Sequence, residues 1–435
     1  MTANLRMMQK TDISAGRRQL LSWLDGERQQ QQDFLVRFAK IDTTNPPGDT
    51  REGVRFIEDF LERQELPTGL IDPAADKPNL FAHLEGGQGE GEQLILNGHV
   101  DVFPVGDPNN WRYDPFGGEI VDNKLIGRGV VDMKCGTTAS IFTYLYLSRL
   151  RHLLSGKLTL CVVSDEETGG YWGSDYLLRE HRDQFLGDCV LNGEPSSVDT
   201  IRFGEKAPFW FRIDVRTQGG HGAYPHLSRN AIRLATELMQ ALYELEDTIV
   251  AMPDKVQQVL ARREVAAAIE KGLGAGASEI VPRITLNIGR IEGGVKVNMA
   301  ADACSFEVDA RLPVGMANDD FLVRVRQIVG RFPEADLVLP KHRLENANWC
   351  DPDGRLLRIM QRNVHDSIGV TAQPIVNLGA TDCRFWRNLG VPAYVHGCSP
   401  EGMGAPNEAV DLDEFFHVVR VHALSAFDYL TTNSD

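Results

Sequence analysis

Residues 158–170 read LTLCVVSDEETGG, an apolar run of strand-forming residues that ends in three adjacent acids and two glycines. The apolar run 158–163 predicts a buried β-strand. Asp165, Glu166 and Glu167 repel one another, so at a strand end they cost free energy unless a partner balances them. A solvated loop is the ordinary explanation for an acidic triplet. A bound cation is the alternative, and it requires further ligands elsewhere in the chain.

Other strands and helices alternate around this strand. Apolar residues have helical spacing at 53–61 and 139–147, whereas strand patterns cover 80–84, 93–100 and 189–192. This alternation is typical of a layered α/β sheet. We therefore predict an α/β fold with a mixed, largely parallel sheet flanked by helices.

The pattern changes near residue 204. Residues 209–215 alternate by twos, as in a half-exposed strand, and 230–245 form an amphipathic helical pattern. We predict a smaller α+β domain at 204–315, inserted between two parts of the larger domain at 1–203 and 316–435.

Length and composition restrict the class of protein. A chain of 435 residues exceeds the usual size of a single core, which favours two domains. A net charge of −16 disfavours nucleic acid and anionic membranes as partners. No apolar run approaches the roughly 20 residues that span a bilayer, and residues 1–20 lack the apolar core of a signal peptide. The seven cysteines are odd in number and not closely paired, which suits a reducing compartment. We expect a soluble cytoplasmic protein.

Candidate metal ligands follow several of the predicted strands. Open α/β sheets place their chemistry at the carboxyl ends of strands, and these ends carry His99, Asp132, the Glu166–Glu167 pair and Glu194. Each residue alone has an ordinary structural explanation, but converging carboxylates need a cation to coexist in a buried site. Imidazole together with carboxylates suits Zn²⁺, with Mn²⁺ or Co²⁺ as alternatives. Asp101, two residues after His99 on extended backbone, points the same way and can orient the imidazole ring.

Four motifs carry a resemblance to a known family. They are GHVDVFP at 98–104, GRGVVDMKCG at 127–136, SDEETGG at 164–170 and GEPSS at 193–197. In this order they closely resemble the metallopeptidase family that includes aminoacylase, acetylornithine deacetylase, succinyl-diaminopimelate desuccinylase and carboxypeptidase G. Residues 43–49 fit the family's N-terminal loop, and 219–223 and 289–294 fit its inserted dimerisation lid.

The resemblance implies roles for the acids. A family metal pair would be bridged by Asp132, with His99 and Glu194 on one ion and Glu167 on the second. Glu166 matches the general base that takes a proton from the attacking water.

The resemblance also implies roles for the inserted domain. His221 matches a histidine that reaches the partner subunit's site and stabilises the oxyanion, so a homodimer is expected. Asn298 and Arg311 match positions that hold the substrate's carboxylate, and an arginine fork suits that task. Without the resemblance, His221 would be interpreted as a turn residue between glycines. For Arg311, a strand arginine that faces solvent is the alternative.

One departure from the family pattern concerns the second ion. The family places a histidine just before a Pro-Asn-Glu stretch, and Gly404 stands at that position here. His396, Cys398 and Glu401 are the nearest donors, and His396 is retained as a candidate metal ligand. We expect one tightly held ion per subunit, with the second ion weak or absent.

These observations predict a metal-dependent hydrolase that cleaves a C–N bond of the amide or N-acyl type in a small, carboxylate-bearing substrate. The altered second site keeps an alternative open, an aminohydrolase that removes an amine from an aromatic or amidine-like carbon. A catalytically silent binding protein on the same fold is the third possibility, although an intact Glu166 in a crowded acidic site argues against it.

Overall fold

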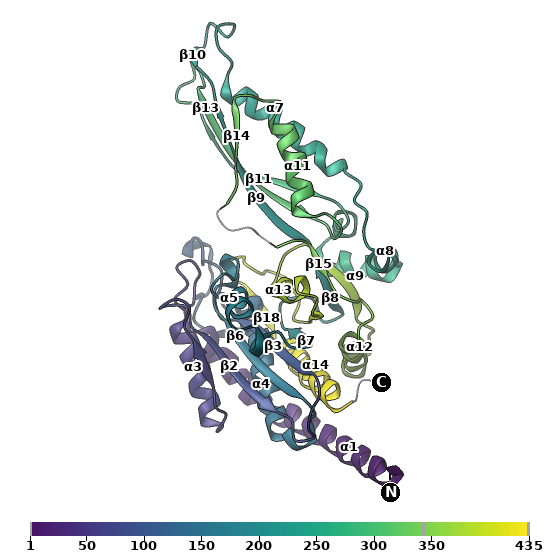
Figure 1. Cartoon of the computed structure of the whole chain (residues 1–435). Helices are drawn as coiled ribbons and strands as arrows, with labels where there is room; N and C mark the ends of the chain where they lie inside the picture. Colours follow the sequence, from purple (N-terminus) through teal and green to yellow (C-terminus); the bar gives the residue numbers. More distant parts are fainter. Residues whose placement is uncertain (1, 341–344, 433–435) are drawn as a thin grey trace.

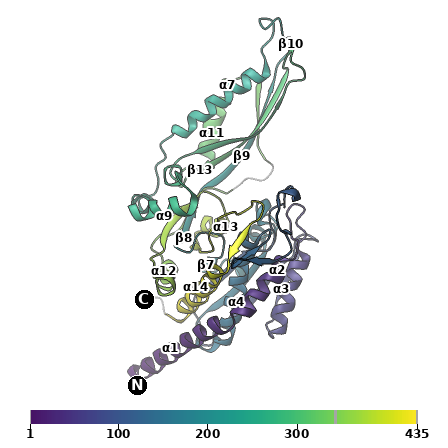
Figure 2. The same cartoon turned by 180° about the vertical axis from the view of Figure 1, so that it is seen from behind.

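The computed structural model describes residues 2–340 and 345–432, with side chains from Asp12 onward. It consists of a larger unit that contains both ends of the described chain and a smaller, elongated unit (Figure 1). The units are joined where strand β8 (Thr200–Glu205) is followed by β9 (Ala207–Arg216). Turned by 180°, the molecule shows the same two parts, with β10 (Gly220–His221) at the far tip of the smaller unit (Figure 2).

The larger unit is built on a mixed sheet with the strand order β1-β2-β6-β3-β7-β17-β8-β15, and β16 also pairs with β8. Its central neighbours β6, β3, β7 and β17 run parallel, whereas β1, β2 and β15 pair antiparallel. The bounds are β1 Gly69–Ile71, β2 Asn79–Glu85, β3 Gln93–His99, β6 Lys157–Val163, β7 Cys189–Asn192, β15 Asn348–Trp349, β16 Gln373–Asn377 and β17 Ala393–Val395.

The central strands are apolar on both faces because helices cover both. On β3, Leu94 and Leu96 belong to one core while Ile95 belongs to another on the opposite face. The first face is covered by the long helices α4 and α14 with α1, α2 and α12; the second is covered by α5, α6 and α13. The bounds are α1 Thr2–Gly26, α2 Arg28–Ala39, α3 Arg51–Arg63, α4 Cys135–Arg149, α5 Ser174–Glu180, α6 Arg182–Phe185, α12 Arg355–Ile368, α13 Cys383–Asn388 and α14 Leu412–Thr431.

The smaller unit has an antiparallel sheet of order β11-β13-β9-β14, with helices α7 and α11 packed on one face. Alternate residues of β9, from Phe209 to Val215, are buried against these helices, as the period-two pattern predicts. The bounds are β11 Thr285–Gly293, β13 Ala303–Leu312, β14 Ala335–Val338, α7 Ala231–Tyr243 and α11 Asn318–Val329; at the tip, β10 pairs with β12, Met299–Ala300. A small sheet of β4 Glu119–Val121, β5 Lys124–Ile126 and β18 Ala409–Asp411 lies in the larger unit.

Two segments pack against a different unit from the one that the predicted domain boundaries at 204–315 assign to them. Helices α8 Asp254–Leu260, α9 Arg263–Leu273 and α10 Ala277–Ile280 fall inside that range, yet their apolar residues join the core of the larger unit. Helix α11 and strand β14 lie beyond residue 315, yet they complete the core and the sheet of the smaller unit. We propose on this basis that the smaller unit ends near Val338.

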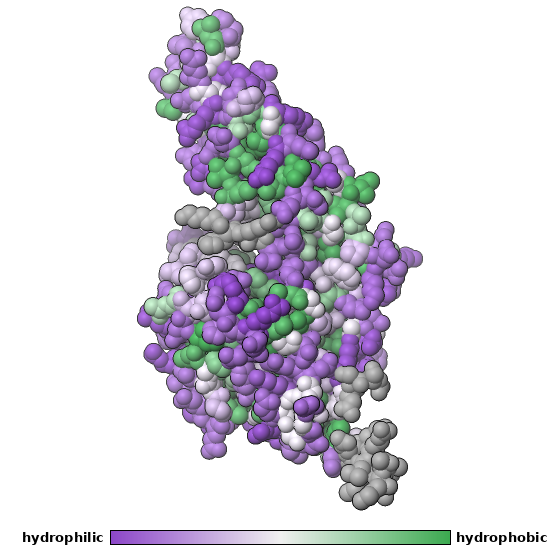
Figure 3. All heavy atoms as spheres, viewed as in Figure 1, coloured by the Kyte–Doolittle hydropathy of each residue, from purple (hydrophilic) through white to green (hydrophobic). Residues whose placement is uncertain are grey.

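The predicted fold class is confirmed: helices flank a mixed, largely parallel sheet, and a smaller α+β unit is attached to it. Hydrophilic residues cover much of the face seen in Figure 3. Among the described helices, none combines the length and apolar character needed to cross a membrane.

Candidate metal centre and active site

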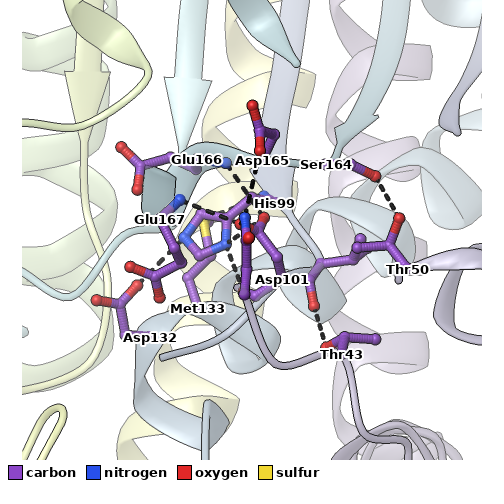
Figure 4. Close-up of polar contacts among 12 residues, drawn as sticks. Thr43, Thr50, His99, Asp101, Asp132, Met133, Ser164, Asp165, Glu166 and Glu167 are labelled. Atoms are coloured by element: carbon purple, nitrogen blue, oxygen red, sulfur yellow. Dashed lines mark hydrogen bonds and ion pairs between the residues drawn. The ribbon is translucent and has the colours of Figure 1, made fainter. Parts of the chain in front are cut away.

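Three neighbouring parallel strands deliver the candidate ligands to one edge of the sheet. His99 is the last residue of β3, Glu166 and Glu167 follow β6, and Glu194 follows β7. The carboxyl ends of parallel strands lie together, so residues distant in sequence meet here (Figure 4). Asp132 lies in the turn Val130–Lys134 that leads into α4.

His99, Asp132 and Glu194 form a compact group of potential ligands. His99 Nε2 lies 3.2 Å from Asp132 Oδ1 and 3.2 Å from Glu194 Oε1. One ligand atom from each residue lies within 4.8 Å of the others, and all three side chains are largely buried. This is the arrangement that three protein ligands of one divalent ion require.

The turn that carries Asp132 is held by a buried carboxylate. Glu408 accepts hydrogen bonds from the backbone N–H groups of Val131, at 2.9 Å, and Asp132, at 3.3 Å. Arg128 Nη1 lies 2.7 Å from the other oxygen of Glu408 and balances its charge. These contacts fix the position of Asp132 from outside the ligand group.

Asp101 links the histidine to the acidic loop. His99 Nδ1 lies 2.8 Å from the main-chain oxygen of Asp101, so a proton on Nδ1 leaves the Nε2 lone pair free for a ligand. The Asp101 carboxylate accepts from the backbone N–H groups of Glu166, at 3.2 Å, and Glu167, at 3.1 Å, and from Asn45, at 2.8 Å. Asp101 therefore orients both the imidazole and the turn that bears the two glutamates.

The charges of this site fit a divalent cation. Burial, together with the nearby Asp132, raises the pKa values of Glu194 and Glu167 well above their usual range. Burial alone would lower the pKa of His99, but its hydrogen bonds to Asp101, Asp132 and Glu194 raise it. Glu167 Oε1 is buried and has no hydrogen-bond partner among the described residues. In Figure 4 its carboxylate faces Asp132. A bound cation would remove the cost of these crowded acids.

Glu166 has a different partner from the other acids. Arg384, on α13, donates from Nη1 to Glu166 Oε1 at 2.9 Å, and both side chains are largely buried. Burial raises the pKa of Glu166, and the charge of Arg384 opposes that rise. A carboxylate oriented in this way, with a pKa shifted upward, has the character of a general base.

Asp165 has a structural position at the start of the acidic loop. Its carboxylate pairs with Lys77 at 2.9 Å and accepts from the Thr168 hydroxyl at 2.6 Å. Its main-chain oxygen accepts from the Gly170 N–H, and its backbone is left-handed, with φ of 78°. Asp165 thus shapes the turn that presents Glu166 and Glu167.

A cavity of about 900 Å³ opens on this group and is bounded by both units. Asp132, Glu166, Glu167 and Glu194 line one side, and Arg311 of β13 lies on the wall from the smaller unit. Arg311 is oriented by Asp309, with Nε to Oδ1 at 2.9 Å.

His221 and Asn298 lie far from the cavity of their own chain. Both are exposed at the tip of the smaller unit, where Gly222 N–H donates to the main-chain oxygen of Asn298 at 2.8 Å. His221 Nδ1 accepts from the Ala223 N–H at 3.1 Å. The structure thus places these two predicted residues beside each other, but not with the metal ligands.

The structure does not bring His396 into the ligand group. It is buried in a cluster with His417 and His422, with ring centroids 5.6 Å and 6.3 Å away. Its Nδ1 lies 2.9 Å from the main-chain oxygen of Thr200. Gly404 adopts φ of 72°, a conformation that favours glycine, and only its backbone N–H contacts Glu408, at 3.3 Å.

The histidine cluster predicts a loss of stability in acid. Burial lowers the pKa values of His417 and His422 to about 3, against an ordinary value of 6.5. Below pH 6.5 the unfolded chain therefore binds more protons than the folded chain, so stability falls as the pH falls towards the folded pKa. At pH 5 each histidine costs about 2 kcal/mol relative to pH 7. His417→Gln is expected to lessen this loss by about that amount in urea unfolding at both pH values. An unchanged pH dependence would refute the assignment, and exposed His365→Gln is the control.

Comparison with known proteins identifies the family. Residues 95–427 match the model of peptidase family M20/M25/M40. The chain belongs to this family. The resemblance and the enzyme class predicted from the sequence, a hydrolase acting on carbon–nitrogen bonds, agree with this membership.

Curated relatives of this M20/M25/M40 chain match over various lengths. A succinyl-diaminopimelate desuccinylase of Ehrlichia canis is 33% identical over 227 residues, which cover 50% of this chain and 56% of that protein. One of Psychrobacter arcticus is 25% identical over 338 residues, 76% of each chain. The chain thus matches little more than half the length of the Ehrlichia protein.

Solved structures show the same fold at low identity. The M20 family metallo-carboxypeptidase Sso-CP2 from Sulfolobus solfataricus has a TM-score of 0.78 and 16% identity, covering 92% of this chain and 99% of that one. The dipeptidase Dug1p from Saccharomyces cerevisiae has a TM-score of 0.73 and 14% identity, covering 96% and 99%. A dinuclear metal-binding peptidase from Bacillus subtilis has a TM-score of 0.60 and 14% identity, covering 94% and 99%.

The sequence did not reveal Arg384, Lys77 or Asn45 as parts of the site. Arg384 follows strand β16 in the stretch GATDCRF at 379–385, so its position after a strand end was an available signal. Lys77 and Asn45 lie in loops whose approach to the acidic turn depends on tertiary packing. Residues 43–49 around Asn45 resemble the family's N-terminal loop, but that resemblance gave Asn45 no role, and the sequence around Lys77 carries no comparable signal.

Proposed function

We propose that this M20/M25/M40 chain is a metal-dependent hydrolase that cleaves an amide or N-acyl C–N bond in a small, carboxylate-bearing substrate. One observation carries the proposal: the buried group His99, Asp132 and Glu194 adjoins Glu166 on a cavity that also contains Arg311. The relatives named desuccinylases and the carboxypeptidase and dipeptidase with the same fold support this class of reaction.

Different residues of the chain have different roles in the proposed reaction. A divalent ion held by His99, Asp132 and Glu194 supplies Lewis-acid chemistry, because it polarises a carbonyl and lowers the pKa of water. Arg384 occupies Glu166 Oε1, so Oε2 is free to accept the proton of the attacking water and to return it to the leaving nitrogen. Arg311 pairs with the substrate's carboxylate and thereby places the scissile bond near Glu166.

The number of tightly bound ions that we expect depends on Gly404, which stands where the family has a metal-binding histidine. Glycine offers no side-chain ligand, and His99, Asp132 and Glu194 form the sole group of three or more potential ligands found in the described part of the chain. We expect one tightly bound ion, Zn²⁺ before Mn²⁺ or Co²⁺, and a weak, exchangeable second ion near Glu167.

A substrate screen tests the proposed function. Metal-loaded protein would be assayed with N-acyl amino acids, dipeptides and arylamines that bear a carboxylate, each with and without a chelator. The proposal expects chelator-sensitive release of the amine from amides. Turnover of arylamines alone would favour the aminohydrolase, and no turnover in the panel would favour a silent binding protein.

We also propose that the active form is a homodimer built through the smaller unit. Strand β11 is an edge of its sheet, and the tip beside it exposes apolar side chains: Ile291, Val295, Val297 and Met299. Exposed apolar residues on an unpaired edge favour association with another chain. His221 and Asn298 lie at this same tip, which is consistent with action in a partner's cavity.

Mixed dimers test whether the site is shared. Glu166→Gln and His221→Ala subunits are each expected to be nearly inactive as homodimers. In a mixed dimer, one cavity combines an intact Glu166 with the intact His221 of the other subunit, so activity should return to about a quarter to a half of the wild-type value, on the order expected for one working site in two. Verified mixed dimers that stay inactive would contradict the shared site.

A further inference from the structure

Arg202 is a buried cation on the wall of the catalytic cavity. It lies in the middle of β8, a strand buried throughout, and only 4% of its surface is exposed. The residue lines the cavity together with Glu194 and Ser197. It belongs to the larger unit, whereas Arg311 reaches the cavity from the smaller one.

Arg202 Nε is fully buried and has no hydrogen-bond partner among the described residues. The other cations on the cavity wall are engaged: Arg384 by Glu166, Arg311 by Asp309, and Lys271 by Asp199. The two acids nearest in sequence have other partners. Asp199 pairs with Lys271. Glu205 pairs with Arg387 at 3.3 Å and accepts a hydrogen bond from the Thr381 hydroxyl at 3.0 Å.

A buried guanidinium that makes no direct ion pair is costly, because the charge has lost its water without a carboxylate in contact to balance it. Glu194 is the largest source of compensating charge. Once Glu194 holds a cation, however, that charge is shared, and Arg202 loses part of the compensation. Because Arg202 lies on the wall of an open cavity, an anion from outside the chain can reach it and balance its charge.

We propose that Arg202 binds an anionic group of the substrate, separate from the carboxylate that Arg311 holds. Two cations from the two units then select substrates with two anionic groups. A guanidinium fork matches the geometry of a carboxylate, as it does that of a phosphate. This inference rests on the proposed function for its substrate, but not for the binding of an anion. Burial lowers the pKa of Arg202 to about 10, which leaves the side chain charged at neutral pH.

The test compares succinate with succinamate, which have nearly the same shape but two charges and one. Dissociation constants would be measured by calorimetry on the metal-loaded protein, so no turnover is required. We expect the wild type to bind succinate at least tenfold more tightly than succinamate, as a charged hydrogen-bonded pair implies. In Arg202→Gln the preference for succinate should fall to about threefold or less. Arg202→Lys should retain part of the wild-type preference.

Exposed Arg358→Gln is the matched control and should keep the wild-type ratio. Metal content and circular dichroism would confirm that each variant is folded and loaded. A ratio near one in the wild type, or a ratio unchanged in Arg202→Gln, would overturn the proposal. If the binding ratios are as expected but the substrate screen finds no turnover, the result would count against the proposed reaction and not against the anion site.

Discussion

Glu166→Gln is expected to lower kcat by about 10²–10⁴-fold, the usual contribution of a general base. The amide keeps the shape of the side chain and its contact with Arg384, but it cannot accept a proton from water. Metal content should stay close to that of the wild type, because Glu166 is not in the group of three ligands. Activity of the purified variant would be measured beside its metal content.

The control for this variant is Glu237→Gln, a change on the exposed face of α7 that should leave activity unchanged. If Glu166→Gln kept activity within about tenfold of the wild type, less than a general base usually contributes, Glu166 would not be the base. A loss of metal together with activity would place Glu166 among the ligands instead.

His99→Ala and Asp132→Ala are expected to lose the tightly bound ion, and activity with it. His99 contributes the nitrogen donor of the group, and Asp132 lies 3.2 Å from it in the same buried cluster. Three ligands are the usual minimum for a catalytic zinc site, so a site with two holds the ion poorly. Elemental analysis after dialysis would measure occupancy.

The loss of the ion should also be visible in thermal stability. A cation that binds only the folded state stabilises it, so added Zn²⁺ should raise the Tm of the wild type and much less that of either variant. Full occupancy in both variants after dialysis would contradict the assigned centre.

The sequence predicted the fold class and the segments that meet at the site because both depend on repeated local patterns. Apolar runs at 93–100, 158–163 and 189–192 became the parallel strands β3, β6 and β7. Once these strands are parallel, the residues that follow them must share one edge, which is why His99 and Glu194 could be grouped without a structure.

Other features depend on contacts that no local pattern encodes. Arg384 reaches Glu166 across 218 positions of the chain. Arg202 lies in a buried strand, and the missing hydrogen-bond partner of its Nε is a property of the packed core. His396 was a candidate ligand by proximity to Gly404 in sequence, but β17 directs it into a histidine cluster. The roles of the predicted site residues stay predictions until the variants are measured.

The central claim is tested most directly by adding Zn²⁺ stepwise to metal-free protein and measuring the rate of hydrolysis at each step. The substrate would be the N-acyl amino acid that the screen finds to be hydrolysed fastest. We predict no measurable rate in the metal-free protein and a linear rise that reaches most of its plateau near one equivalent per subunit. Hydrolysis by the metal-free protein, or no hydrolysis at full occupancy of the His99, Asp132 and Glu194 centre, would contradict the account.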